Sequence, residues 1–166
     1  MLRHLVITIL CVTLASCSGY RLGDVKPAKL QHIQSITIPQ FKNDTLVPRV
    51  STLVTNSTVD AIAQDGTYAI RSYDQSDAVL HATVTQIEYD QFRANRFDTL
   101  ASDELKVTIH VSWELKQQGV TLISSTSTGS TTFDFEDNLA ISRQNALPLA
   151  SARTAQNIVS QLSEGF

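Results

Sequence analysis

The clearest pattern in the chain is a strict alternation of apolar and polar residues from Leu105 to Lys116. Such alternation is typical of a strand that buries one face and leaves the other in water. Gln117-Gln118-Gly119 follows as a hairpin turn, and the Thr-rich stretch from Val120 to about Phe133 returns beside that strand. The inward residues are expected to be Leu105, Val107, Ile109, Val111, Trp113 and Leu115.

A second long strand is predicted from Ala78 to about Tyr89. Its apolar residues alternate up to Val84, and the phase then moves to Ile87, as a β-bulge would cause. Two shorter strands come before it, at Ser35 to Gln40 and at Tyr68 to Ser72. The pattern therefore predicts a mainly antiparallel sheet of four to five strands.

Two helices are predicted from apolar residues that repeat at helical spacing. The first begins after Pro48 and ends at Asp65-Gly66, because glycine suits a left-handed turn. The second is capped by Asp137-Asn138 and runs to about Ser163, and Pro148 inside it predicts either a kink or two helices that meet. The fold class is therefore α+β: a two-layer sandwich with both helices packed on one face of the sheet and Thr, Ser and Lys on the other.

The N-terminus carries a different pattern. Arg3 and His4 give a basic start, an apolar stretch follows, and the small residues Ala15-Ser16 come directly before Cys17. This order is typical of a secretory signal peptide, and its end resembles the lipobox of bacterial lipoproteins. The resemblance implies that a diacylglycerol is attached to the Cys17 thiol, that the chain is cut before this residue, and that the new amino group is acylated. The alternative is a core helix in which Cys17 is a buried thiol.

Acylation would hold the protein at a membrane surface. The apolar run is shorter than the ~20 residues that cross a bilayer, whereas several acyl chains anchor a protein durably. Ser18 after the cysteine, where aspartate would favour inner-membrane retention, resembles outer-membrane lipoproteins. We therefore expect a lipid-anchored protein at the periplasmic face of the outer membrane, with residues 1–16 as signal peptide, 17–31 as tether and 32–166 as a single domain.

Charge and composition reduce the classes of function that the protein can have. Removing the signal takes away one counted charge, Arg3, and leaves 12 Lys and Arg against 16 Asp and Glu, which gives no support for nucleic-acid binding. The three histidines of the mature chain, His32, His81 and His110, lack the paired spacing of metal ligands, and we expect them to be structural residues on strand faces. The sequence also lacks a nucleophile elbow and a phosphate-binding glycine loop. We therefore expect no enzyme, no metal site and no cofactor apart from the covalent diacylglycerol and N-acyl chain.

Several motifs stand in a fixed order after the lipobox cysteine. They are the segments 17–22 and 36–45, Pro48-Arg49-Val50 at the start of a helix, Asp77 to Leu80 in the central strand, the hairpin, and the C-terminal helix. With them the mature chain resembles the LptE family, lipoproteins that pair with the outer-membrane barrel LptD in lipopolysaccharide assembly. The resemblance implies the sandwich predicted above. It also implies that the protein plugs the lumen of an LptD-like β-barrel, assists its assembly and contacts lipopolysaccharide on its way to the outer leaflet.

Three basic residues are candidates for contact with lipopolysaccharide. Arg93 and Arg96 lie in the segment from Gln91 to Asp103, which we expect to be a protruding hairpin tip or loop, and Lys106 follows closely. Such side chains suit phosphates and sugar acids. The alternative is that all three are solvated surface charges. Two other function classes also stay open: a periplasmic interaction module, similar to lipoprotein activators of cell-wall synthases or the curli secretion lipoprotein, and a small lipid-binding lipoprotein.

Overall fold

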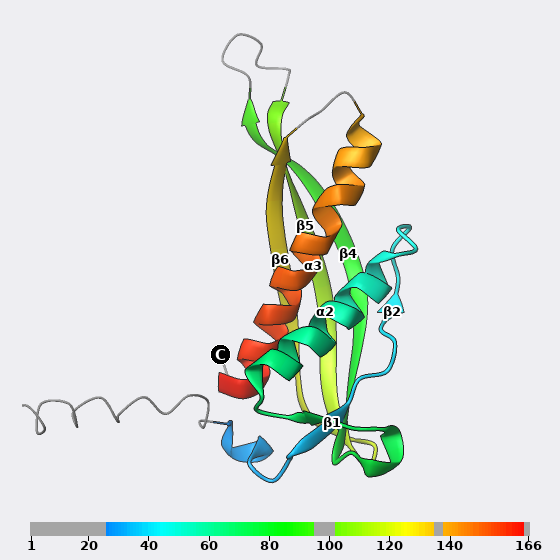
Figure 1. Cartoon of the computed structure of the whole chain (residues 1–166), viewed down its shortest axis with the longest axis vertical. Helices are drawn as coiled ribbons and strands as arrows, with labels where there is room; N and C mark the ends of the chain where they lie inside the picture. Colours follow the sequence, from blue (N-terminus) through cyan, green and yellow to red (C-terminus); the bar gives the residue numbers. More distant parts are fainter. Residues whose placement is uncertain (1–25, 95–101, 135–137, 165–166) are drawn as a thin grey trace, which may run out of the picture.

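The computed structural model describes residues 26–94, 102–134 and 138–164, which form a six-stranded sheet with two helices on one face (Figure 1). The strand order is β3-β1-β4-β5-β6, and β2 pairs separately with β4. The predicted α+β sandwich is confirmed, with six strands in place of four to five. The long strands form an antiparallel meander of β4 (Ala78–Ala94), β5 (Ser102–Gln117) and β6 (Val120–Asp134), and the short strands β1 (Ser35–Thr37), β2 (Lys42–Asn43) and β3 (Ala69–Ile70) pair in parallel.

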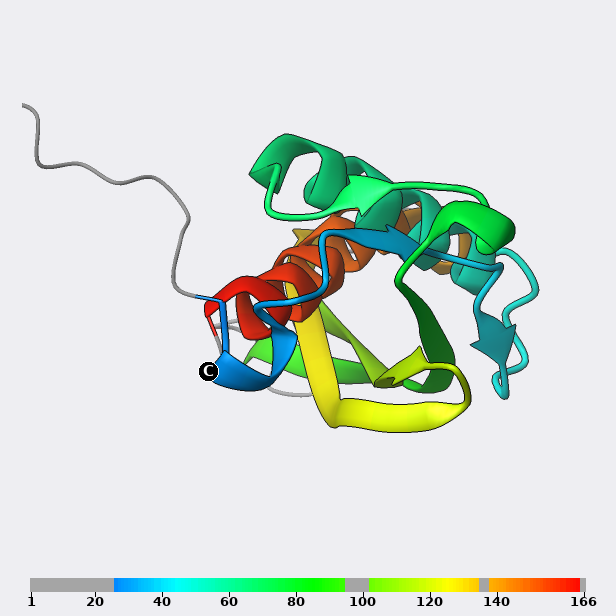
Figure 2. The ribbon, with the colours of Figure 1, turned by 90° about the horizontal axis from the view of Figure 1, so that it is seen from below.

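Both helices cover the same face of the long strands (Figure 2). α2 (Val50–Asp65) packs on α3 (Leu139–Glu164), and α3 also lies along β6. α2 ends at Gly66, whose φ of 74° is the left-handed turn that the sequence predicts. At the other helix, the Asn138 side chain accepts a hydrogen bond from the Ala140 N–H at 3.1 Å, so the predicted cap is confirmed for this residue.

α3 runs through Pro148 as a single helix of 26 residues. Of the two outcomes that the sequence allowed, the meeting of two separate helices is wrong. Proline removes one backbone hydrogen bond from the helix, but tertiary packing supplies most of the stability of a helix in a protein. Because α3 packs on both α2 and β6, it tolerates that loss.

The core lies between the helices and the inner face of the meander. The inward residues predicted on β5 are buried from Val107 to Leu115, and Trp113 retains 2% of its exposure. The register of β4 against β5 shifts between Val84 and Gln86, which confirms the bulge inferred from the change of apolar phase. The predicted hairpin turn is confirmed at Gln118 (φ 49°) and Gly119 (φ 84°), which form a two-residue turn, whereas Gln117 is the last residue of β5 and pairs with Val120.

Three predicted boundaries are wrong. The strand expected from Tyr68 to Ser72 covers only Ala69–Ile70, because only these residues pair with β1. The strand expected from Ser35 to Gln40 ends at Thr37, because the chain bulges away from β4 around Pro39, which has no N–H to donate, and returns as β2. The hairpin tip or loop expected from Gln91 to Asp103 is shorter, since β4 continues to Ala94 and β5 starts at Ser102, and the two strands form a hairpin. At these ends of β4 and β5 the apolar alternation stops, although the backbone groups of the two strands still pair.

The described chain enters the domain beside the C-terminal end of α3. Lys26 Nζ donates to the Ile33 carbonyl at 3.0 Å and lies 4.5 Å from the centre of the Tyr68 ring, and the Tyr68 hydroxyl donates to the Leu162 carbonyl at 2.9 Å. Burial, and secondly the nearby Asp65, raise the pKa of Tyr68 to about 12, so the phenol stays a donor. Leu30, in the range assigned to the tether, is fully buried, so the core reaches back at least to this residue.

Within the described ranges, no helix is both long enough and apolar enough to span a bilayer.

Asp77 joins β1 to the start of β4, and we predict that its replacement by alanine destabilises the fold by about 1–2 kcal/mol. The Asp77 carboxylate accepts hydrogen bonds from the Gln34 N–H at 3.0 Å, the Ser35 N–H at 2.8 Å and the Ser35 hydroxyl at 2.9 Å. The Gln34 bond first, and then those from Ser35, hold the pKa of Asp77 below its usual 3.8. The stabilisation is therefore complete above about pH 4 and is lost as the pH falls through the lowered pKa. Denaturant unfolding of the wild type and of Asp77→Ala between pH 7 and pH 3 measures both the destabilisation and its pH dependence, and a loss of stability in acid that is equal in the two proteins would contradict the prediction.

Candidate functional site

The face of the meander that points away from the helices is polar across its three strands. This outer face confirms the expectation that Thr, Ser and Lys gather opposite the helices, and it offers many hydrogen-bonding groups and little apolar area. Its residues include His81, Thr83, Thr85, Gln86, Glu88, Lys106, Thr108, His110, Ser112, Glu114, Lys116, Ser124, Thr126 and Thr128.

Part of the Ser/Thr run on β6 faces the core instead. Ser127 and Thr131 are buried, with 2% and 4% of their exposure left. The Trp113 indole N–H donates to the Ser127 hydroxyl at 2.9 Å, and this hydroxyl donates to Gln161 Oε1 at 3.1 Å. The inner half of the run therefore ties the centre of β5 to α3, while the outer half stays on the surface.

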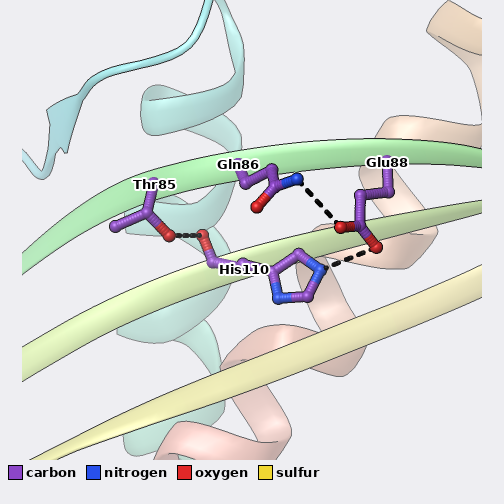
Figure 3. Close-up of polar contacts among 4 residues, drawn as sticks. All are labelled: Thr85, Gln86, Glu88 and His110. Atoms are coloured by element: carbon purple, nitrogen blue, oxygen red, sulfur yellow. Dashed lines mark hydrogen bonds and ion pairs between the residues drawn. The ribbon is translucent and has the colours of Figure 1, made fainter.

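A polar cluster lies at the middle of the outer face (Figure 3). His110 Nε2 on β5 is 3.2 Å from Glu88 Oε2 on β4, an ion pair when the histidine is protonated, without the geometry of a hydrogen bond. The Gln86 amide donates to the other oxygen of Glu88 at 2.9 Å, and the Thr85 hydroxyl donates to the His110 carbonyl at 3.2 Å. The described residues assemble no group of three or more His, Cys, Asp or Glu side chains that could hold a metal ion. The cluster is suited to hydrogen bonding with a partner.

A hollow of about 680 Å³ opens on the same face between the β1–β2 connection and β5. Lys42, His81 and Lys116 lie around the single carboxylate of Glu114. Lys116 Nζ is 2.5 Å from Glu114 Oε1, and the Thr121 hydroxyl donates to Oε2 at 3.1 Å. The hydrogen bond from Lys116 is the main reason that the pKa of Glu114 lies below its ordinary value. The hollow is therefore lined by charged groups that can meet polar groups of either sign.

The structure tests the residues predicted from the sequence only in part. Cys17 and Arg96 lie outside the described residues. Arg93 lies in β4 opposite Glu104, so of the two predicted places, a hairpin tip or a loop, it lies in the paired end of the β4–β5 hairpin. Lys106 lies on the outer face of β5, opposite Asp90 and Thr132. The backbones of Arg93 and Lys106 are thus on neighbouring strands, and the proposed grouping of the three basic residues stays a prediction.

The histidines were predicted on strand faces. This is confirmed for His81 and His110. It is wrong for His32, which precedes β1 and lies with its Nε2 3.1 Å from Gln117 Oε1 at the β5–β6 turn. Even there the side chain holds two parts of the fold together, which is a structural role.

Sequence reasoning missed two contacts from α3 to β6. The Arg153 guanidinium donates to the Ser130 carbonyl and the Asn157 amide to the Thr128 carbonyl, both at 2.6 Å. The only signal in the sequence is that the two residues are four apart and so share one side of a helix. Which strand they reach depends on where α3 lies.

A model of the LptE family, described as lipopolysaccharide-assembly, matches residues 33–162. No curated protein matches the chain. Among solved structures, protein XCC0632 from Xanthomonas campestris is similar at a TM-score of 0.59 and 16% identity, covering 84% of this chain and 90% of its own. A putative lipoprotein from Caulobacter crescentus is similar at 0.54 and 20% identity, covering 77% and 88%. Lipoprotein B from Nitrosomonas europaea is similar at 0.54 and 13%, covering 80% and 84%. At these identities the three structures show a shared fold.

Proposed function

The chain belongs to the LptE family, and from this membership we propose that it is an outer-membrane lipoprotein that pairs with an LptD-like β-barrel and plugs its lumen. As a member of this family it is an LptE-like lipoprotein of the cell envelope. The finer role in our proposal is to assist the assembly of the barrel and the delivery of lipopolysaccharide to the outer leaflet. The role is non-catalytic, and acyl chains on Cys17 supply the anchor.

The family match carries this proposal, because residues 33–162 span the whole sheet, α2 and all but the last two residues of α3. The outer face supports it physically. The lumen of a large outer-membrane barrel is polar, and a plug inside it must exchange hydrogen bonds with water for hydrogen bonds with the wall. A sheet face of Ser, Thr, His and charged residues meets that requirement.

Affinity capture tests the pairing. Outer membranes are extracted with detergent, and the lipoprotein is recovered through a tag at its C-terminus. The expected result is co-purification of one very large β-barrel protein in about equal amount, with none from cells that carry the untagged chain. Recovery of the lipoprotein alone, or with a cell-wall synthase instead of a barrel, would overturn the proposal.

Direct contact with lipopolysaccharide is a separate expectation, which concerns Arg93, Arg96 and Lys106. Replacing all three by alanine is expected to lower lipopolysaccharide capture at least about tenfold, because each charged hydrogen bond to a phosphate contributes about 1.5 kcal/mol or more. A pull-down with purified lipopolysaccharide measures it. The matched control replaces the exposed residues Lys29, Arg49 and Arg71, which lie outside β4 and β5, and it removes the same charge. Equal capture by the two triple variants would show that the first three are ordinary surface charges.

A further inference from the structure

β6 is the terminal strand of the sheet, and one of its edges faces away from β5 (Figure 1). In an antiparallel ladder, alternate residues turn both backbone groups to the same side of the strand. The carbonyls of Thr128 and Ser130 point away from β5, since α3 side chains reach them. The register is unbroken from Ile123 to Asp134, so Ser124 and Thr126 turn their N–H and C=O groups to the same outer edge.

Part of this edge is already occupied by side chains of α3. The Asn157 and Arg153 side chains donate hydrogen bonds to the carbonyls of Thr128 and Ser130. These bonds block strand addition along the part of β6 beside α3. For Ser124 and Thr126, no other segment of the described chain donates to or accepts from the edge groups. Both residues are exposed. The edge is therefore open toward the turn that joins β5 and β6.

From Ile123 to Phe133 the edge lacks the devices that usually prevent strand addition, and the register shift of β6, between Thr121 and Ile123, lies next to the turn. Natural edge strands carry charged residues, proline or bulges. β4 follows this rule beyond Val84, where it has only β5 as a neighbour, because it carries Glu88 and Asp90 and shifts register three times. From Val120 to Phe133, β6 has no charged residue and no proline, and it is rich in Thr, a residue with high strand propensity.

We propose that an extended segment of the partner barrel adds to β6 at Ser124 and Thr126 as a further antiparallel or parallel strand. This inference rests on the proposed function and names the contact through which it works. The open edge borders the outer face. Under the proposed function the outer face meets the luminal wall of the barrel, so the edge and the face contact the same partner. Backbone pairing supplies the affinity in this mode of recognition. Arg153 and Asn157 set where the added strand ends.

The test is a proline at Thr126 in the full-length lipoprotein. Proline removes the N–H that points outward and leaves the bonds to β5 intact, so the fold is expected to survive. Loss of the edge hydrogen bonds is expected to reduce barrel recovery in affinity capture about tenfold, with the thermal midpoint of the lipoprotein within a few degrees of wild type. The matched control, Thr126→Val, keeps the N–H and removes only the hydroxyl on the outer face, so it is expected to lower barrel recovery far less than Thr126→Pro does.

The other possible results of this experiment would overturn the inference, and one of them would also overturn the proposed function. Wild-type recovery by Thr126→Pro would overturn the inference while the proposed function stands. If the proline variant does not fold, the double variant Ser124→Lys with Thr126→Lys takes its place, because it adds charge to the edge without changing the backbone, and its retention of the barrel would also overturn the inference. A lipoprotein dimer that Thr126→Pro disrupts would assign the edge to a second copy and overturn it. Failure of the wild type to recover any barrel would remove the proposed function and the inference with it.

Discussion

Replacing Gly129 by alanine is expected to push α3 off β6 and to destabilise the protein by about 3 kcal/mol or more. A Cβ at this position would lie 2.2 Å from the Thr154 backbone N, 2.4 Å from the Thr154 hydroxyl and 2.7 Å from the Ala150 carbonyl. Two of these atoms belong to the backbone of α3, so a rotamer change cannot relieve the contact. Denaturant unfolding followed by circular dichroism measures the loss.

The cause of this effect is space and not backbone conformation. Positive φ angles occur in the described chain at Gln118, Gly66 and Gly119, and Gly129 is not among them. The control is Thr126→Ala on the same strand, where the side chain is exposed and a change within about 0.5 kcal/mol is expected. A Gly129→Ala protein as stable as this control would show that α3 can lie further from the sheet without loss.

The fold was predictable because its largest elements have clean periodicity. The alternation on β5, the bulge after Val84 and the Gln118-Gly119 turn each leave a local mark in the sequence that fixes one element or one connection. Gly129 leaves no such mark. It stands in a run of Ser and Thr, and its importance comes from the closeness of α3, an element that follows later in the chain.

The candidate site was predictable as a face and not as a set of contacts. Alternation assigns Lys106 and His110 to the outer side of β5, since every second residue points the same way. The contact of His110 with Glu88 depends on the register between two strands, which a bulge shifts by one residue. The contact of Asn157 with β6 depends on the position of a helix against a sheet edge. Such long-range geometry has no local signal.

Replacing Cys17 by serine is expected to abolish labelling by palmitate and to remove the protein from the outer membrane. Each buried methylene of an acyl chain contributes ~0.8 kcal/mol, so two or more chains hold a protein durably, whereas one chain binds only reversibly. A serine hydroxyl does not replace the thiol as the acceptor of the diacylglycerol in the lipobox reaction. Metabolic labelling followed by separation of inner-membrane, outer-membrane and soluble fractions measures both effects.

Cys11→Ser is the matched control, because it changes the other cysteine of the chain and lies in the part that the predicted cleavage removes. It is expected to leave labelling and location as in the wild type. Label that persists in Cys17→Ser would place the acyl chains elsewhere, and an unlabelled wild type would mean that Cys17 is an ordinary thiol. The anchor and the pairing with a barrel are separable here: a soluble Cys17→Ser protein that still captures the barrel in detergent would show that the folded domain alone, through its outer face and the edge of β6, recognises the partner.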